Sequence, residues 1–217
     1  MGQQLHGADL ARANLSGKNL SCADLSFASL EGASLKDADL SGSNLEGANL
    51  RDANLRGANL FGANLRGASL VGAELRGENL MEANLTHANL TAAHLGGARL
   101  SGADLKGANL SRADFRNAKL IEADLSFADL TRATLAHADL CRAFLTRANL
   151  TRANLGGADL DGADLRDANL SRANLGGANI YNHFGQSADF TGADLTGATM
   201  PPAEPADSRL KPPFDRW

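Results

Sequence analysis

The residues best suited to do chemistry in this 217-residue chain are five histidines and two cysteines. Imidazole and thiolate groups bind metals and serve as bases or nucleophiles in enzymes. No serine is placed with a histidine and an acid as a hydrolase motif requires, and no glycine-rich phosphate loop precedes a helix. We therefore predict a non-enzymatic protein that needs no cofactor and binds no metal. These histidines and cysteines are His6, His87, His94, His137, His183, Cys22 and Cys141.

A second chemically suggestive set is a series of arginines at intervals of 20 residues. It consists of Arg112, Arg132, Arg152 and Arg172, without a gap. Guanidinium groups bind carboxylates and phosphates through paired N–H donors. Whether the four side chains form one surface depends on the elements that carry them.

The whole chain is organised by an internal period of five residues. Every fifth residue from Leu5 to Ile180 is apolar, and the same phase resumes after Gly185 and ends at Met200. Alanine stands two residues before nearly every centre, usually with Asp, Asn or Ser between them. An α-helix would spread these centres around its circumference, and a flat strand would expose every second one. The period instead fits a chain that turns a corner every five residues, with centre and alanine facing inward.

The residues around each centre have turn chemistry. Of the 23 glycines, 18 lie two residues after a centre, where a tight turn can require positive φ. No proline precedes Pro201, as expected if each coil donates backbone N–H groups to the next. Four corners would close a square coil of 20 residues. The chain would then form about ten coils, each rising about 4.8 Å as neighbouring strands do.

Units such as Ala-Asp-Leu-Ser-Gly and Ala-Asn-Leu-Arg-Gly resemble the pentapeptide-repeat family, whose pattern is Ala-Asp/Asn-Leu-X-X. The resemblance covers residues 3–200. It implies an all-β fold, a right-handed quadrilateral parallel β-helix, in which each coil contacts only its neighbours. We assign residues 1–200 to this β-helix and residues 201–217 to a proline-rich C-terminal tail. Within the tail, Leu210, Phe214 and Trp217 would cap the last coil, or the tail extends as an arm.

Residues 20 apart stack in columns under this fold, so each flank has its own composition. The four arginines become either a strip that docks an acidic or phosphate-bearing partner or a set of solvated side chains. Another column contains apolar residues that would contact a protein partner or form a homodimer, although Ser101 and Asp161 interrupt it. Scattered exposed apolar residues are the plainer reading. The apolar members of this column are Phe61, Met81, Ile121 and Tyr181.

The same columns separate the groups that could bind metal or form a disulfide. His87 and His137 fall on opposite faces, and His94 lies two coils from His137. Cys22 and Cys141 are six coils apart, about 29 Å at strand spacing, which is too far for a disulfide.

Two charged residues in alanine slots and one segment near the C-terminal end are the departures from the repeat that need an explanation. Lys18 and Glu78 occupy alanine slots, and because a charge in a dry core is costly, we expect each to turn outward or to find backbone partners. The segment 181–187 keeps the five-residue count. We therefore expect a distorted corner there rather than an inserted loop, which is either a degenerate coil or a binding site.

Charge and hydropathy narrow the function classes. The net charge is −4, with 21 basic and 25 acidic residues, which predicts no direct binding of nucleic acid. No apolar run approaches the roughly 20 residues that cross a bilayer, and residues 1–6 lack the features of a signal peptide. We expect a cytoplasmic location and no membrane association.

Two functions remain. The first is a rod-like scaffold that binds another protein through one face. The second comes from the resemblance, because some pentapeptide-repeat proteins mimic duplex DNA and bind type II topoisomerases such as DNA gyrase. That activity needs a strongly negative surface, whereas basic residues form the clearest column here. The chain also differs from those members by its nearly uniform leucine centres, its lack of inserted loops and its lack of a terminal dimerisation helix.

Overall fold

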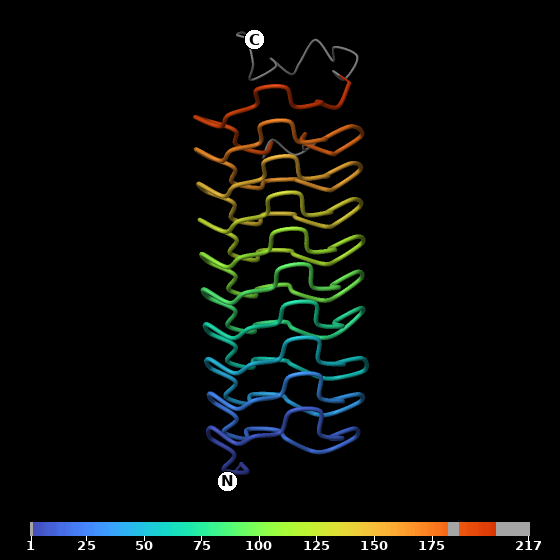
Figure 1. Ribbon diagram of the computed structural model, residues 1–217. Helices are drawn as coiled ribbons and strands as arrows, with labels where there is room; N and C mark the ends of the chain where they lie inside the picture. Colours follow the sequence, from blue (N-terminus) through green and yellow to red (C-terminus); the bar gives the residue numbers. More distant parts are fainter. Residues whose placement is uncertain (1, 182–186, 203–217) are drawn as a thin grey trace.

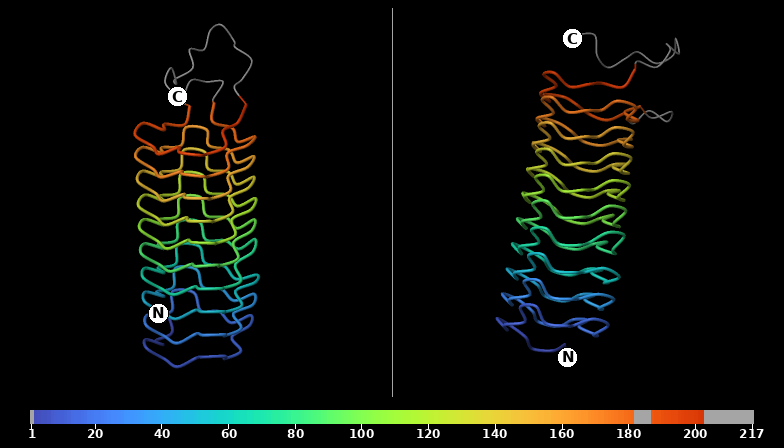
Figure 2. Two further views of the ribbon diagram at one scale, coloured as in Figure 1. Left: turned by 45° about the horizontal axis from the view of Figure 1, so that its top comes forward. Right: turned by 45° about the vertical axis from the view of Figure 1, so that its right-hand side comes forward.

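The computed structural model describes residues 2–181 and 187–202, which form one rod of stacked coils (Figures 1 and 2). These residues contain no helix, so none that could cross a membrane. Their β structure consists of isolated parallel bridges, from Gln4 with Asp24 to Asn174 with Thr199. Four corners complete each coil. The chain is a right-handed quadrilateral β-helix, as the family resemblance predicted.

Each corner is a tight turn closed by one backbone hydrogen bond. At a representative corner, the Ala28 N–H donates to the Leu25 carbonyl at 3.1 Å, and Phe27 between them has φ 57°. The equivalent position has positive φ at 18 glycines and 19 other residues. Positive φ at this one turn position is typical of a type II turn. The prediction that the glycines lie at positive φ is confirmed.

Backbone hydrogen bonds join every coil to the next. Around Leu25, the Leu25 N–H donates to the Asn44 carbonyl at 2.7 Å, and the Phe27 N–H donates to the Glu46 carbonyl at 2.8 Å. In the opposite direction, the Asn44 N–H donates to the Ala23 carbonyl at 2.9 Å. Side chains at the position before each centre complete the turn, as where Asn14 Oδ1 accepts the Ser16 N–H at 3.1 Å. These bonds explain why the coils contain no proline.

The core is a continuous column of leucine and alanine along the axis of the rod. The inward positions from Leu20 to Phe190 are buried, and most centres are 0% exposed. Phe115 is the one aromatic centre that is fully buried among the described residues. At the two ends, the centres are only partly buried, including Leu10 and Leu195. Many small, similar side chains therefore replace the few large aromatics of an ordinary core.

The corner near residue 181 differs from the prediction. Up to Asn179 the bridges join residues 20 apart, but Asp164 bridges Asp189, which is 25 residues away. The Ala188 N–H closes this corner on the Ile180 carbonyl at 3.1 Å, a span of eight residues where other corners span three. The expected distorted corner was wrong, because this corner holds an insertion of five residues.

An insertion of one whole period leaves the phase of the repeat unchanged, so the pattern could not reveal it. The rod consequently has nine complete coils and three faces of a tenth. The inserted residues 182–186 lie outside the described part of the chain. The same holds for the expected cap of Leu210, Phe214 and Trp217, since only Pro201 and Pro202 of the tail are described.

The two charged residues in alanine slots behave as expected. Lys18 lies in the end coil and is exposed. Glu78 is buried, and its Oε1 accepts the backbone N–H of Gly57 at 2.7 Å. One has turned outward and the other has found a backbone partner, so the prediction is confirmed.

Candidate functional site

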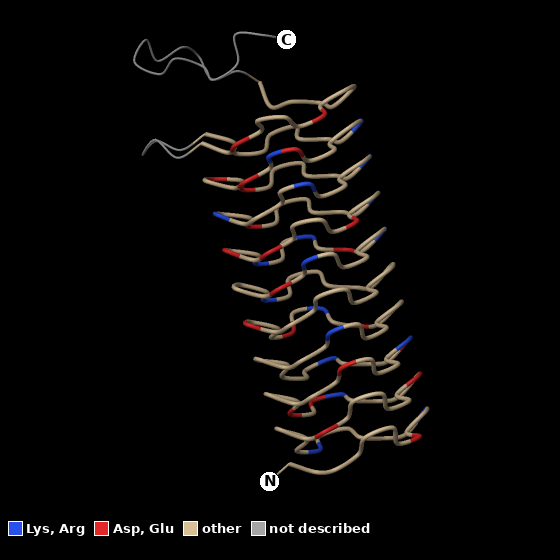
Figure 3. Cartoon of the chain, turned by 90° about the vertical axis from the view of Figure 1, so that its left-hand side faces the viewer, with Lys and Arg blue, Asp and Glu red and all other residues tan. Residues whose placement is uncertain are grey.

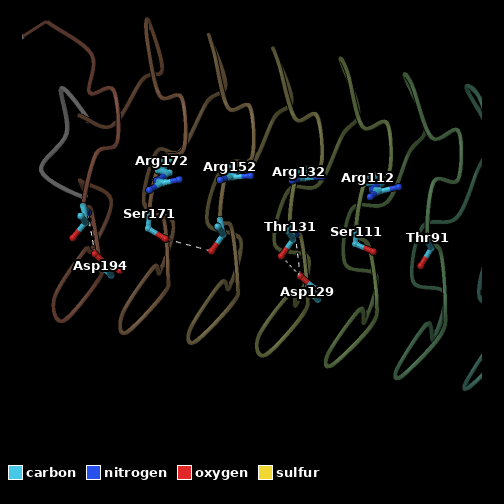
Figure 4. A pocket seen from close by; sticks show the side chains of 12 residues that line it. Thr91, Ser111, Arg112, Asp129, Thr131, Arg132, Arg152, Ser171, Arg172 and Asp194 are labelled. Carbon is cyan, nitrogen blue, oxygen red and sulfur yellow. Dashed lines mark hydrogen bonds between the residues drawn. The ribbon is translucent and has the colours of Figure 1, made fainter.

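A groove of about 710 Å³ runs along one flank of the rod, parallel to its axis. All of its lining residues belong to one face of successive coils. Figure 4 shows the guanidinium groups of Arg112, Arg132, Arg152 and Arg172 in one row, beside a row of hydroxyl groups. The hydroxyl row consists of Thr91, Ser111, Thr131, Thr151, Ser171 and Thr196.

The turn geometry directs the four arginines outward. Each occupies the left-handed position of its corner, with φ between 59° and 60°. The left-handed region costs a residue other than glycine about 1–2 kcal/mol. Glycine fills the equivalent position in the next coil, at Gly197. All four arginines are exposed, so this flank replaces glycine with a long cation at four consecutive coils.

The hydroxyl row forms a fixed floor for the groove. Thr151 Oγ1 donates to Asn149 Oδ1 at 2.7 Å, and Ser171 Oγ donates to Asn169 Oδ1 at 2.6 Å. Asn149 Nδ2 in turn donates to Thr131 Oγ1 of the coil below at 2.9 Å. The hydroxyl groups of Thr91, Ser111 and Thr131 donate in the same way, so the arginines are the free donors along this row.

The groove arginines differ from the other basic residues of this half of the rod because they have no partner among the described residues. Among the described residues from 75 to 200, every other lysine or arginine makes an ion pair, a hydrogen bond or a ring contact. The ion pairs are Arg76–Glu74, Arg116–Asp114, Lys119–Asp139, Arg142–Glu122, Arg147–Asp167 and Arg166–Asp164. Arg99 donates to the Met81 sulfur at 3.1 Å, and Lys106 lies over the Phe127 ring.

Stacking explains the difference. Arg142 pairs at 2.8 Å with Glu122, which stands 20 residues away in the same column. The column neighbours of Arg132 are Arg112 and Arg152, so no acid stands one coil above or below it. Unit charges about 4.8 Å apart repel by roughly 1 kcal/mol in water. The flank therefore carries an unneutralised line of positive charge.

Two carboxylates also line the groove, but both are engaged within their own turns. Asp129 Oδ1 accepts the Thr131 backbone N–H at 3.0 Å and the Thr131 hydroxyl. Hydrogen bonds from the side chain and backbone of Thr196 lower the pKa of Asp194 below its ordinary value. Neither acid pairs with an arginine, so the groove keeps an excess of positive charge.

The apolar column is less continuous than the arginine row. Phe61 is 41% exposed, whereas Met81, Ile121 and Tyr181 are half-buried. Ser101 and Asp161 separate them, as the sequence indicated. The structure thus places the four residues in one column without bringing them into one patch.

Three further exposed aromatics escaped the sequence analysis. Phe27, Phe127 and Phe144 are 62%, 51% and 49% exposed, on a different flank from Phe61. Phe127 lies between two cations, with Lys106 Nζ 5.8 Å and the Arg147 guanidinium carbon 5.9 Å from its ring centre. Their signal in the sequence was an aromatic residue in a slot that faces outward.

One cluster of possible ligand atoms also escaped it. Asp139, Cys141 and Asp159 place one ligand atom each within 4.8 Å of the others, the one group of three found in the described residues. Burial and hydrogen bonds to the two carboxylates raise the pKa of the Cys141 thiol well above its ordinary value. The protonated thiol is a poor metal ligand. The signal would have been aspartates one coil apart beside a cysteine. Cys22 and Cys141 are both free.

Comparisons with known proteins agree with the fold. The model of the family described as pentapeptide repeats matches in eight copies that together span residues 4–201. No curated protein matches the chain.

Solved structures do match. HetL, a pentapeptide-repeat protein of the cyanobacterium Nostoc sp. strain PCC 7120, is 37% identical over 90% of this chain and 87% of its own, with a TM-score of 0.51. Full-length QnrB1, a plasmid-mediated fluoroquinolone resistance protein, is 17% identical over 89% of this chain and 92% of its own, with a TM-score of 0.50.

Proposed function

Because this chain belongs to the pentapeptide-repeat family, we propose that it is a non-enzymatic scaffold that binds another protein through the arginine groove. The observation that carries the proposal is the row of four arginines, which have no partner within residues 2–181 and 187–202. The other described basic side chains of this half of the rod are all engaged. Unpaired charges on one flank leave binding energy for a partner.

The filled interior favours a scaffold over an enzyme. Centres such as Leu100 and Leu150 are 0% exposed, so no substrate can enter the rod. On the surface, the groove presents guanidinium groups, which stay protonated and are poor general bases. Its two carboxylates hold their own turns together. Binding is the activity that these groups support.

The relatives support the same class of function. HetL is involved in the regulation of heterocyst differentiation, and a regulatory role is compatible with a scaffold. Two of every five positions in this fold are taken by alanine and leucine, so an identity of 37% largely measures the shared fold. The outward-facing side chains determine which partner binds, and the arginine groove is the most distinctive feature that they form.

Mimicry of DNA is the second candidate, and the charge pattern disfavours it. Basic and acidic residues interleave along the rod in Figure 3. Among the described residues, no column of stacked positions is an uninterrupted run of Asp and Glu, which is the pattern that mimicry needs. The likeness to QnrB1, at 17% identity, concerns the fold alone. The five-residue insertion removes one of the sequence differences from gyrase-binding members, namely the lack of inserted loops. Inhibition of DNA gyrase therefore remains a competing outcome of the test.

We further propose a cytoplasmic location and a protein partner. The two cysteines are free, as is usual in a reducing compartment. A homodimer through the column of Phe61 and Met81 is a weaker proposal, because Ser101 and Asp161 interrupt that surface.

The test compares two double variants with an identical change in charge. Arg132/Arg152→Gly empties the centre of the groove. Arg142/Arg147→Gly removes two arginines from the same turn position on other flanks, with φ 55° and 58°. Glycine already occupies 18 of these corners, so neither variant strains the backbone.

Affinity capture from a native lysate, quantified by mass spectrometry, then decides. We expect proteins that the wild type and Arg142/Arg147→Gly retain and that Arg132/Arg152→Gly loses. Identical capture by all three proteins would overturn the proposal. Inhibition of gyrase supercoiling by the wild type at micromolar concentration would replace it with topoisomerase mimicry.

A further inference from the structure

Building on the proposed function, we infer that the occupant of the groove is an acidic α-helix that presents one carboxylate on each successive turn. The four arginines define the pattern that the partner must match. They stand one coil apart, at about 4.8 Å per step, because the coils hydrogen-bond like neighbouring strands.

The spacing of an α-helix fits this row of four arginines. Carboxylates three or four residues apart lie on one face of a helix and rise about 5.4 Å per turn. Over three steps, the helix advances about 16 Å and the arginines about 14 Å. Long, flexible arginine and glutamate side chains can absorb a difference of this size. Each step of the ladder therefore meets one turn of the helix.

Other extended anions fit less well. Alternate side chains of a β-strand recur about every 6.7 Å, so three steps cover about 20 Å and the register is lost. Phosphates of a DNA strand recur about every 3.4 Å along the axis, which is too close. A second copy of this chain is also a poor occupant, since its described residues contain no helix.

The ends of the arginine row set the length of the helix. The groove passes six coils, from Thr91 to Thr196, but Ala92 and Gly197 stand at the corner positions beyond the four arginines. Four carboxylates on successive turns need about 12 residues of helix. A shorter acidic segment would leave part of the row unpaired.

The floor of the groove restricts recognition to the arginines. The Thr151 and Ser171 hydroxyls donate to Asn149 and Asn169, so the floor offers few hydrogen-bond donors to a partner. Repulsion between like charges one step apart disfavours both the unoccupied row of arginines and an acidic helix face. Pairing relieves both repulsions together. We expect the groove to prefer partners whose carboxylates have helical spacing. We expect it to tolerate different residues at the positions between those carboxylates.

Three designed peptides with the same number of glutamates test this inference against the full chain. The first carries glutamates on one face of an alanine-rich helix, one per turn over four turns. The second distributes the same glutamates around the helix. The third keeps their spacing but is interrupted by prolines, which prevent the helix. Fluorescence anisotropy measures the affinity of each, at low and high salt.

We expect the one-faced helix to bind at least about tenfold more tightly than either of the other peptides, because only it engages all four arginines. Arg132/Arg152→Gly should weaken that binding by about tenfold, and Arg142/Arg147→Gly should leave it unchanged within about twofold. Added salt should weaken binding, because the contacts are exposed ion pairs.

Three results would overturn the inference. One is equal affinity for the three peptides, which would make the groove a site for any acidic chain. Another is tighter binding of duplex DNA or polyphosphate than of the one-faced helix. The third is a loss of helix binding in both double variants alike. None of these decides the scaffold function, because the capture experiment tests groove-dependent partners without any peptide. A capture result without groove-dependent partners would count against the scaffold itself.

Discussion

Glu78 Oε1 accepts the backbone N–H of Gly57 at 2.7 Å, in the place where neighbouring corners use a carbonyl of the next coil. The Asp52 N–H donates to the Val71 carbonyl at 2.9 Å, and the Gly62 N–H donates to the Met81 carbonyl at 3.0 Å. A side chain has thus replaced one rung of the backbone ladder. The Glu78 side chain is buried, and burial raises the pKa of its carboxyl group above the ordinary value of 4.5.

The raised pKa predicts that Glu78 weakens the fold at neutral pH. A carboxyl group whose pKa is higher in the folded state stabilises the protein below its unfolded-state pKa, and this contribution is lost as pH rises through the folded-state pKa. Glu78→Ala, which restores the repeat, should raise the free energy of unfolding by about 1 kcal/mol at neutral pH.

Thermal unfolding of the wild type, Glu78→Ala and Glu78→Gln between about pH 4 and about pH 8 checks this prediction. The stability that both variants gain over the wild type should grow as the pH rises above 4.5. Lower stability of both variants at neutral pH would show that the bond to Gly57 outweighs the cost of burial.

The two arginine double variants should differ in how their stability depends on salt. Arg132/Arg152→Gly relieves repulsion within a column, so its stability relative to wild type should be highest at low salt, by about 1 kcal/mol. Arg142/Arg147→Gly loses the pairs with Glu122 and Asp167, so its relative stability should rise with salt. Urea unfolding at two salt concentrations measures both, and parallel salt dependence would contradict the pairing.

Cys141 should react far more slowly than Cys22 with a thiol reagent. The thiolate is the reactive form, and burial together with Asp139 and Asp159 raises the pKa of the Cys141 thiol. Cys22 lies exposed at a corner. Iodoacetamide labelling followed by peptide mass spectrometry should show Cys141 modified at least about tenfold more slowly at mildly alkaline pH. Comparable labelling rates of the two cysteines in the folded protein would contradict the raised pKa of the Cys141 thiol. Labelling in urea supplies the control.

Loss of a leucine should matter more in the middle of the rod than at its end. Leu100 is 0% exposed, so Leu100→Ala should lower the free energy of unfolding by about 2–5 kcal/mol. Leu10 is partly buried in the first coil, and Leu10→Ala should cost about half as much. Denaturant unfolding compares the two, and equal losses would argue against a graded, coil-by-coil stability.

Much of this fold could be predicted because a solenoid makes long-range contacts periodic. Once the period placed centres such as Leu100 inward, residues 20 apart had to become neighbours, and the bridges follow that rule up to Asn179. The arginine column followed from the same count. The turn at Gly102 was expected as well, because its chemistry is local.

The tertiary structure decided what periodicity cannot encode. The insertion after Tyr181 spans one full period, so it leaves the phase intact and shows only in the bridge from Asp164 to Asp189. The count of 20 residues places Glu122 one coil from Arg142, but the contact of 2.8 Å between their side chains depends on the reach of flexible groups across coils. A repeat dictates the direction in which each side chain points. The partner that a side chain finds there is set by three-dimensional distances across neighbouring coils.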